Sequence, residues 1–178
     1  MLGFNEPDGR DQANMSVERA LDLWPELEAA GVMLGSPAAV KGTKPGMTEF
    51  MAGAKSRGYR VDFVAVHWYG GCGVEPFIKH LHEVHELYGL PIWITELGVA
   101  DWKAKDCASN KFTPQQVQAF MRKLLPRLDA LDFVHRYAWF CFHQNSRVGH
   151  CSALFAPDNT LTELGKIYAN HTAPTNTG

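Results

Sequence analysis

The sequence lacks the features that mark several specialised classes of protein. Its 178 residues hold no apolar run near the roughly twenty residues that a membrane span requires. No signal peptide is visible, because the chain opens directly on a strand-like segment, residues 1–4. The formal net charge is only −2, so no strongly basic surface points to nucleic acid. We therefore expect a globular domain with neither a membrane span nor a nucleic-acid partner, and the length is sufficient for one core.

The sequence also lacks a recognisable arrangement of cysteines. The spacing of Cys72, Cys107, Cys141 and Cys151 matches neither a zinc signature nor a C-x-x-C redox motif, and we expect no metal site and no cofactor. Cys141 falls in a strand-like run and the other three fall in predicted loops. Two alternatives stay open: the cysteines are free or buried thiols, or a disulfide links two of the three loop cysteines in a secreted protein.

What the sequence does contain is a regular alternation of strand-like and helix-like segments. The predicted strands cover residues 2–4, 32–34, 61–67, 92–95 and 136–142. The predicted helices cover residues 16–30, 47–56, 76–88, 114 to about 131, and 161–168. Gly31 and Gly89 follow two of these helices as stop signals, and Thr113 with Pro114 is a favoured helix start.

Five βα pairs of this kind predict an α/β fold with a parallel sheet covered by helices. A closed (β/α)₈ barrel has eight such pairs and typically about 250 residues, so five pairs fit an open sheet or part of a barrel. The polar residues 171–178 are expected to form a flexible C-terminal tail. Residues 1–170 are then expected to form one domain.

Polar and aromatic side chains gather where the predicted strands end, which is where barrels of this type place their active-site residues. These side chains belong to Asn5, Glu6, His67, Trp68, Tyr69, Glu96 and Trp139. Two carboxylates at the ends of two parallel strands are what a retaining glycosidase needs, since one donates a proton and the other is the nucleophile. Glu6 and Glu96 are therefore the candidate catalytic pair.

Several of these residues have a purely structural alternative. Glu6 could be an acid beside a helix N-terminus, and Glu96 could be the partner of an ion pair at the start of a loop. His67 could be a structural histidine, and Trp139 could be plain core. The coincidence of both glutamates at one edge of the sheet favours catalysis for the pair, and a strand-end Trp139 favours a platform for a sugar ring.

The same segments resemble clan A of the glycoside hydrolases, which keeps an Asn-Glu pair after its fourth strand and a nucleophilic Glu after its seventh. More narrowly, the chain resembles family 128, endo-β-1,3-glucanases with a glycosyl hydrolase catalytic core. The matching segments, in one-letter code, are LGFNEPD (2–8), QANM (12–15), GSPA (35–38), HWY (67–69), PIWITE (91–96), RYAWF (136–140) and LTELG (161–165). The resemblance runs from residue 2 to about residue 169.

This resemblance implies a role for each residue at the strand ends. Glu6 would be the general acid/base and Glu96 the nucleophile of a double displacement, with their carboxyls roughly 5 Å apart. The resemblance also implies supporting roles. Asn5 would bind the sugar hydroxyl next to the reacting carbon, His67 would line the cleft near Glu6, Tyr69 would orient Glu96, Trp139 would floor the cleavage subsite, and Trp68 and Trp102 would be weaker substrate contacts.

The resemblance further implies a β-glucan polysaccharide or oligosaccharide as substrate and an extracellular or cell-wall location. Counted by the family pattern, Glu6 follows the fourth strand. The chain is therefore expected to hold the C-terminal five βα units of a TIM barrel, without the three that precede them. Sheet edges at residues 2–4 and 136–142 would then be open to self-association. The alternatives are a carbohydrate-binding pseudo-enzyme or inactive fragment, and a clan relative that acts on β-1,4-glucan or mannan.

Overall fold

The computed structural model of the protein describes residues 1–172, which fall into two compact units. Unit 1 consists of Met1–His67, His80–Thr95 and Phe133–Tyr137, and unit 2 consists of Trp68–Lys79, Glu96–Asp132 and the chain from Ala138 onward. Of the expected flexible tail, residues 173–178 lie outside the described residues. His171 is described, and its Nε2 lies 2.6 Å from Oδ2 of Asp129.

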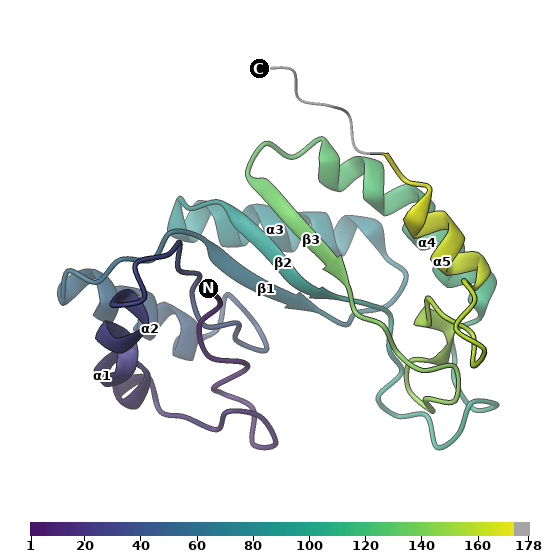
Figure 1. Cartoon of the computed structure of the whole chain (residues 1–178), viewed down its shortest axis with the longest axis horizontal. Coiled ribbons are helices and arrows are strands. Elements are labelled where there is room, and N and C mark those ends of the chain that lie inside the picture. The colour runs from purple at the N-terminus through teal and green to yellow at the C-terminus, as the bar shows by residue number, and fades with distance from the viewer. Residues whose placement is uncertain (173–178) are drawn as a thin grey trace. The chain divides into compact units, whose positions relative to one another are not determined.

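Three strands form one sheet in the order β1-β2-β3, with bounds Val64–Trp68, Ile92–Leu97 and Val134–Trp139 (Figure 1). The β1 and β2 strands run parallel, because Val64 N–H bonds to Pro91 O at their starts and Gly98 N–H bonds to Trp68 O at their ends. The predicted α/β class is confirmed. Each strand contributes its first residues to unit 1 and its last residues to unit 2.

The two strands predicted at residues 2–4 and 32–34 do not form. Each of these regions keeps a single parallel bridge instead, between Asn5 and Ala38 and between Gly35 and Phe63. The pairing partners follow the predicted order, but the ladder is interrupted because Pro37 has no N–H to donate and Glu6 leaves the extended conformation with a φ of +40°. The predicted neighbours are therefore right and the predicted strands are wrong.

Unit 1 is built around helices α1 (Val17–Glu28) and α2 (Pro45–Ser56). Ser16 caps α1 through a hydrogen bond from the Arg19 N–H. The ring of Trp24, on α1, is completely buried and packs edge-on against Phe50, with 4.8 Å between the ring centroids. Its indole N–H donates to Arg60 O. Truncation of so buried an aromatic typically costs about 3–5 kcal/mol of stability, so this contact holds the unit together.

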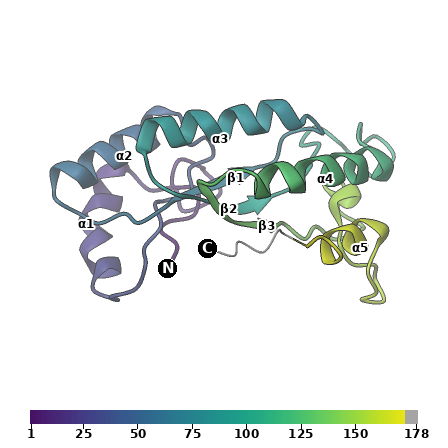
Figure 2. The ribbon, with the colours of Figure 1, turned by 90° about the horizontal axis from the view of Figure 1, so that it is seen from above.

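Unit 2 is built around α4 (Pro114–Asp129) and α5 (Glu163–Ala169), which lie side by side (Figure 2). The predicted start of α4 is confirmed, because Thr113 forms a capping box with Gln116. The buried side of α4 follows helical spacing and comprises Val117, Phe120, Met121, Leu124, Leu125 and Leu128. A short 3₁₀ turn, His150–Ser152, precedes α5, and Thr162 caps α5.

Helix α3 (Val74–Tyr88) divides between the units, with its first residues in unit 2 and its remainder in unit 1. Strand β3 ends earlier than predicted, at Trp139. The Phe142 N–H turns back to Phe140 O instead of pairing with a neighbouring strand, so Cys141 lies in a turn. Among the residues that the structure describes, no helix is both long enough and apolar enough to cross a membrane.

Candidate active site

Glu6 belongs to unit 1 and projects from a short irregular loop that follows the first paired segment. Its φ of +40° lies in the left-handed region, which costs roughly 1–2 kcal/mol for a residue with a Cβ atom. Hydrogen bonds on both sides hold this conformation: Glu6 N–H donates to Ala38 O and Gly9 N–H donates to Glu6 O, each at 2.8 Å. Two residues further on, the Asp8 carboxylate accepts from Val40 N–H at 3.0 Å. The surroundings thus impose the backbone of Glu6.

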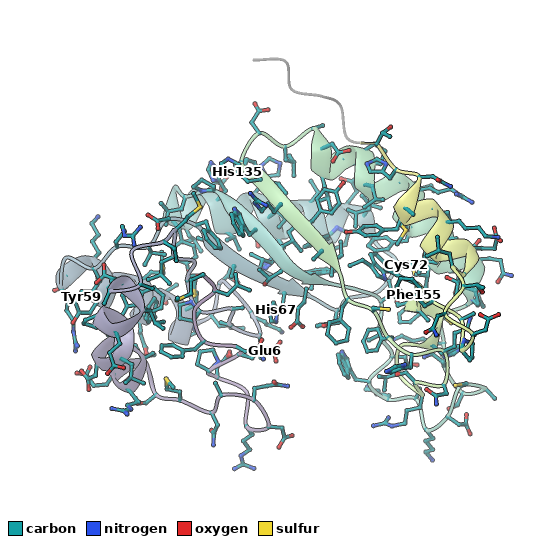
Figure 3. The ribbon with its side chains drawn as sticks, viewed as in Figure 1. Glu6, Tyr59, His67, Cys72, His135 and Phe155 are labelled. Atoms are coloured by element: carbon teal, nitrogen blue, oxygen red, sulfur yellow. The ribbon has the colours of Figure 1, made fainter. Side chains whose placement is uncertain are left out.

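The structure brings His67 to Glu6 within unit 1. The Nδ1 atom of His67, near the end of β1, lies 2.9 Å from Oε1 of Glu6, and the two side chains meet in Figure 3. His67 is only 7% exposed, so this hydrogen bond is largely shielded from water. An imidazole in this position can fix the carboxyl of Glu6 and exchange a proton with it. Asn5 is exposed, and its amide N–H donates to Oε1 of Gln12 at 3.0 Å.

Glu96 belongs to unit 2 and lies within strand β2. The Tyr69 hydroxyl, just beyond the end of β1, donates to Oε2 of Glu96 at 2.5 Å. The strand end is fixed by main-chain pairing, because Gly98 N–H bonds to Trp68 O and Phe140 N–H bonds to Leu97 O. A carboxylate on a paired strand with a phenol on one oxygen is held in a defined direction, as a nucleophile requires.

The ring of Tyr69 is surrounded by three other aromatic rings of unit 2. Trp102, Phe140 and Phe142 each meet it edge-on, with centroids 5.6, 5.5 and 5.8 Å away. Trp102 is 60% exposed and Phe140 is 40% exposed, so both offer ring surface to a ligand. Sequence reasoning assigned Trp102 to the site but missed Phe140 and Phe142, because both fell in a run interpreted as strand.

The two other predicted aromatic contacts have structural partners. Trp68 stacks on Phe77 of α3, with centroids 4.7 Å apart and planes at 20°. Trp139 is only 6% exposed, and its indole N–H donates to Ser152 O at 2.9 Å. Both rings support the strand ends, and any contact of Trp139 with a ligand is limited to the small exposed part of its ring.

The loop that carries Trp102 is anchored by a buried carboxylate. Asp101 accepts hydrogen bonds from the N–H groups of Lys111 and Lys103, at 3.0 and 3.2 Å. The hydrogen bond from Lys111 N–H is the main cause that holds the pKa of Asp101 below its ordinary value. Asp101 therefore stays ionised and keeps the base of the loop closed.

Cysteine chemistry is a poor alternative at this site. All four cysteines are free thiols. Burial is the main cause that raises the pKa of Cys151 to about 11, and burial also raises the pKa of Cys72. Both thiols are therefore protonated near neutral pH and are weak nucleophiles. Glu6 and Glu96 stay the candidate pair that the sequence predicts.

Comparison with known proteins gives consistent relatives. A family model described as "Glycosyl hydrolase catalytic core" matches residues 1–168. A GH128 subgroup I endo-β-1,3-glucanase from Amycolatopsis mediterranei, solved with laminaritriose, is 38% identical with a TM-score of 0.84, over 94% of this chain and 70% of that chain. A GH128 subgroup III curdlan-specific exo-β-1,3-glucanase from Blastomyces gilchristii, solved with glucose, is 31% identical with a TM-score of 0.74. That match covers 96% of this chain and 69% of that chain.

Among curated proteins, Alkali-sensitive linkage protein 1 of Schizosaccharomyces pombe is 32% identical over 179 residues. The match covers 94% of this chain and 32% of that protein. The chain thus spans about a third of the length of the curated relative that it matches.

Proposed function

Because the chain belongs to the glycosyl hydrolase catalytic core family, with glucanases of glycoside hydrolase family 128 as relatives, we propose that it hydrolyses β-1,3-glucan with retention of configuration. The observation that carries this proposal is that each of the two candidate glutamates has its own hydrogen-bond partner: His67 for Glu6 and Tyr69 for Glu96. The β-1,3-glucanase activity of these relatives and the laminaritriose bound to one of them support the substrate class. We further propose that the fold is part of a (β/α)₈ barrel and that the glucan is extracellular or in a cell wall.

In the first proposed step, Glu96 attacks the anomeric carbon while the protonated carboxyl of Glu6 gives its proton to the leaving glycosidic oxygen. A glycosyl ester forms on Glu96, the C–O bond of the linkage breaks, and Glu6 is left ionised. In the second step Glu6 takes a proton from water as that water attacks the same carbon. Glu96 is released and both carboxyl groups return to their starting state.

The surrounding residues position these groups and the sugar. Tyr69 orients Glu96, and His67 holds Glu6 through the shielded hydrogen bond described above. The exposed ring of Trp102 provides a surface against which the C–H face of a glucose ring packs. Asn5 is the proposed ligand of the hydroxyl next to the reacting carbon. Trp68 and Trp139 act mainly through the strand ends that they support.

The stereochemistry of the first product tests this proposal. Proton NMR of laminarin digestion by the purified chain should show the β-anomer appearing first and the α-anomer forming later by mutarotation. First appearance of the α-anomer would mean inversion and would overturn the double displacement.

A substrate panel separates the proposal from its alternatives. Laminarin, cellulose, mannan and xylan would be compared by product analysis and by direct binding. Cleavage of laminarin alone supports the proposal, and cleavage of cellulose or mannan instead indicates a clan relative with another specificity. Binding of laminarin with no product indicates a carbohydrate-binding pseudo-enzyme. Endo action predicts a ladder of laminari-oligosaccharides, in contrast to the release of glucose from chain ends.

A further inference from the structure

We propose that Phe142, seated against Gly149, is a positioning residue that fixes the ring of Tyr69 and, through the Tyr69 hydroxyl, the carboxylate of Glu96. The inference rests on the proposed role of Glu96 as nucleophile. It adds a residue that supports Glu96 indirectly and that lies outside the sequence motifs assigned to the site. All of these residues lie in unit 2.

The first observation is the packing of Phe142 between two other rings. It meets Tyr69 edge-on, at 72° between planes, and it meets Phe140 at 4.9 Å between centroids and 66°. Phe140 contacts Tyr69 as well, so the three rings form a closed triangle. Phe142 is half-buried, whereas Phe140 is exposed enough to meet solvent directly. Phe142 is therefore the inner, supporting member of the triangle.

The second observation is the space that glycine leaves for Phe142. A Cβ atom built on Gly149 would lie 2.2 Å from Cγ of Phe142, far closer than atoms can approach. The φ of Gly149 is −129°, outside the left-handed region that favours glycine, so a positive φ is not what demands glycine there. A Cβ atom on Gly98 would lie 3.3 Å from the Phe142 ring and 3.4 Å from the Tyr69 ring. Gly149 is thus required by the ring that rests on it.

The third observation is that the seat itself is held firmly. Gly149 N–H donates to Oγ of Ser146 at 3.2 Å, and Ser152 N–H donates to Gly149 O at 2.8 Å. The preceding residue is tied to the Trp102 loop, because Asp101 N–H donates to Val148 O at 2.8 Å. A ring placed on this segment therefore has a fixed backing.

The geometry of a tyrosine explains why its ring needs such support. The hydroxyl is the atom farthest from the backbone, so a small rotation about the Cα–Cβ bond moves it more than any ring carbon. Rotation in one direction is opposed by Phe142. Loss of that opposition would let the hydroxyl leave Glu96 Oε2, and a misplacement near 1 Å can reduce turnover by roughly a hundred-fold.

The first test is a pair of substitutions, Phe142→Ala and Tyr69→Phe, alone and together, in the full chain. Phe142→Ala should lower kcat on laminarin by roughly ten- to a hundred-fold with little change in KM. In the Tyr69→Phe background it should have little further effect, because the hydroxyl it positions is already gone. A raised KM, or an undiminished effect in that background, would show direct contact with substrate and overturn the inference.

The second test uses the seat. Gly149→Ala should reproduce the kcat loss in the wild-type background but should be nearly neutral in a Phe142→Ala background, where the clash is removed. Additive effects would overturn the inference. Phe155→Ala, at an exposed phenylalanine, and Gly46→Ala, where an added Cβ meets no atom within 4 Å, are the matched controls.

A structural readout separates this inference from the proposed function. In crystals of Phe142→Leu, which keeps apolar volume if Phe142→Ala fails to fold, the distance from the Tyr69 hydroxyl to Glu96 Oε2 should lengthen. An unchanged distance would overturn the inference even if the chain hydrolyses laminarin. A lengthened distance in a protein that cleaves no glucan would sustain the positioning and reject the hydrolase.

Discussion

The two glutamates are held in opposite ways by the two units of the molecule. In unit 1, Glu6 projects from an irregular loop with a left-handed backbone and meets an imidazole, His67. In unit 2, Glu96 lies within a paired β-strand and meets a phenol, Tyr69, which other aromatic rings surround. The first setting relies on a few specific hydrogen bonds, whereas the second relies on regular sheet pairing and ring packing.

This difference suits the two proposed roles. A nucleophile attacks one carbon along one direction, so a rigid strand and a fixed phenol suit Glu96. A general acid/base serves a glycosidic oxygen in the first step and a water in the second, so it benefits from a partner that can itself exchange protons. The comparison predicts that substitutions around Glu96 slow the nucleophilic attack on the anomeric carbon, whereas substitutions around Glu6 slow the proton transfers.

The largest expected effect is the loss of turnover when either glutamate is replaced, and the choice of substrate distinguishes the role of Glu6 from that of Glu96. Glu96→Gln should reduce turnover of every substrate by roughly a thousand-fold or more, because no other group supplies the nucleophile. Glu6→Gln should cause a comparable loss on laminarin but a much smaller loss of glycosylation rate on an aryl laminari-oligosaccharide, whose leaving group needs no proton. Steady-state and burst kinetics on both substrates measure the difference.

Glu26→Gln, on the exposed part of α1, is the control for the charge change. If Glu96→Gln kept a tenth of the wild-type activity, Glu96 would not be the nucleophile. If Glu6→Gln lowered the glycosylation rate by the same factor on both substrates, the assignment of Glu6 as the acid/base would be wrong.

A smaller effect is expected at Asp8, whose carboxylate supports the Glu6 loop. Its exposed carboxylate accepts from Val40 N–H, and a solvent-exposed hydrogen bond of this kind typically contributes about 0.5–1.5 kcal/mol. Asp8→Ala should loosen the Glu6 loop, lower kcat/KM by about ten-fold and speed amide exchange in residues 6–15. Asp8→Asn, which keeps a hydrogen-bond acceptor, should have a kcat/KM and an amide-exchange rate between those of the wild type and Asp8→Ala.

The exposed Asp11→Ala is the matched control in the same loop. Equal amide exchange in Asp8→Ala and Asp11→Ala would show that the loop does not depend on this hydrogen bond. The left-handed backbone of Glu6 would then need another explanation.

The smallest expected effect concerns acid stability of the Trp102 loop in unit 2. Hydrogen bonds from Lys111 and Lys103 lower the folded-state pKa of Asp101. The stabilisation is therefore complete above the unfolded pKa, about 4, and is lost as pH falls through the lower folded value. The Tm advantage of the wild type over Asp101→Asn should therefore stay constant above about pH 5 and shrink as the pH falls below about 4. The exposed Asp132→Asn is the matched control, and a constant gap for Asp101→Asn across the same pH range would contradict the proposed anchor.

Much of the fold could be predicted because its signals are local. Thr113 with Pro114 marks the start of α4, and the Val-rich run before His67 gives β1. The segments at residues 2–4 and 32–34 were predicted in the right order but not as the isolated bridges that form. Their pairing is cut short by the missing N–H of Pro37 and by the turned backbone of Glu6. Neither feature changes the apolar pattern from which the two strands are predicted.

The candidate site was only partly readable for a different reason. Charged residues at strand ends stand out, so Glu6 and Glu96 could be proposed from the sequence. Phe142 could not, because it falls in a run that is interpreted as strand, where an aromatic residue is indistinguishable from core until its neighbours are known. Gly149 carries no signal of its own, since its meaning lies in the ring that occupies the space beside it.

The uneven exposure of the tryptophans gives the protein a built-in optical reporter. Trp102 lies mostly in solvent, whereas Trp24 and Trp139 are sealed from it. The emission of Trp102 therefore lies at the red side of the protein's fluorescence and is the part that iodide quenches most strongly, ahead of the half-buried Trp68 and Trp93. A glucan that packs on this ring would shift its emission to the blue and protect it from quencher, so binding can be followed without any label. Unfolding would instead expose the sealed rings and move the emission the other way.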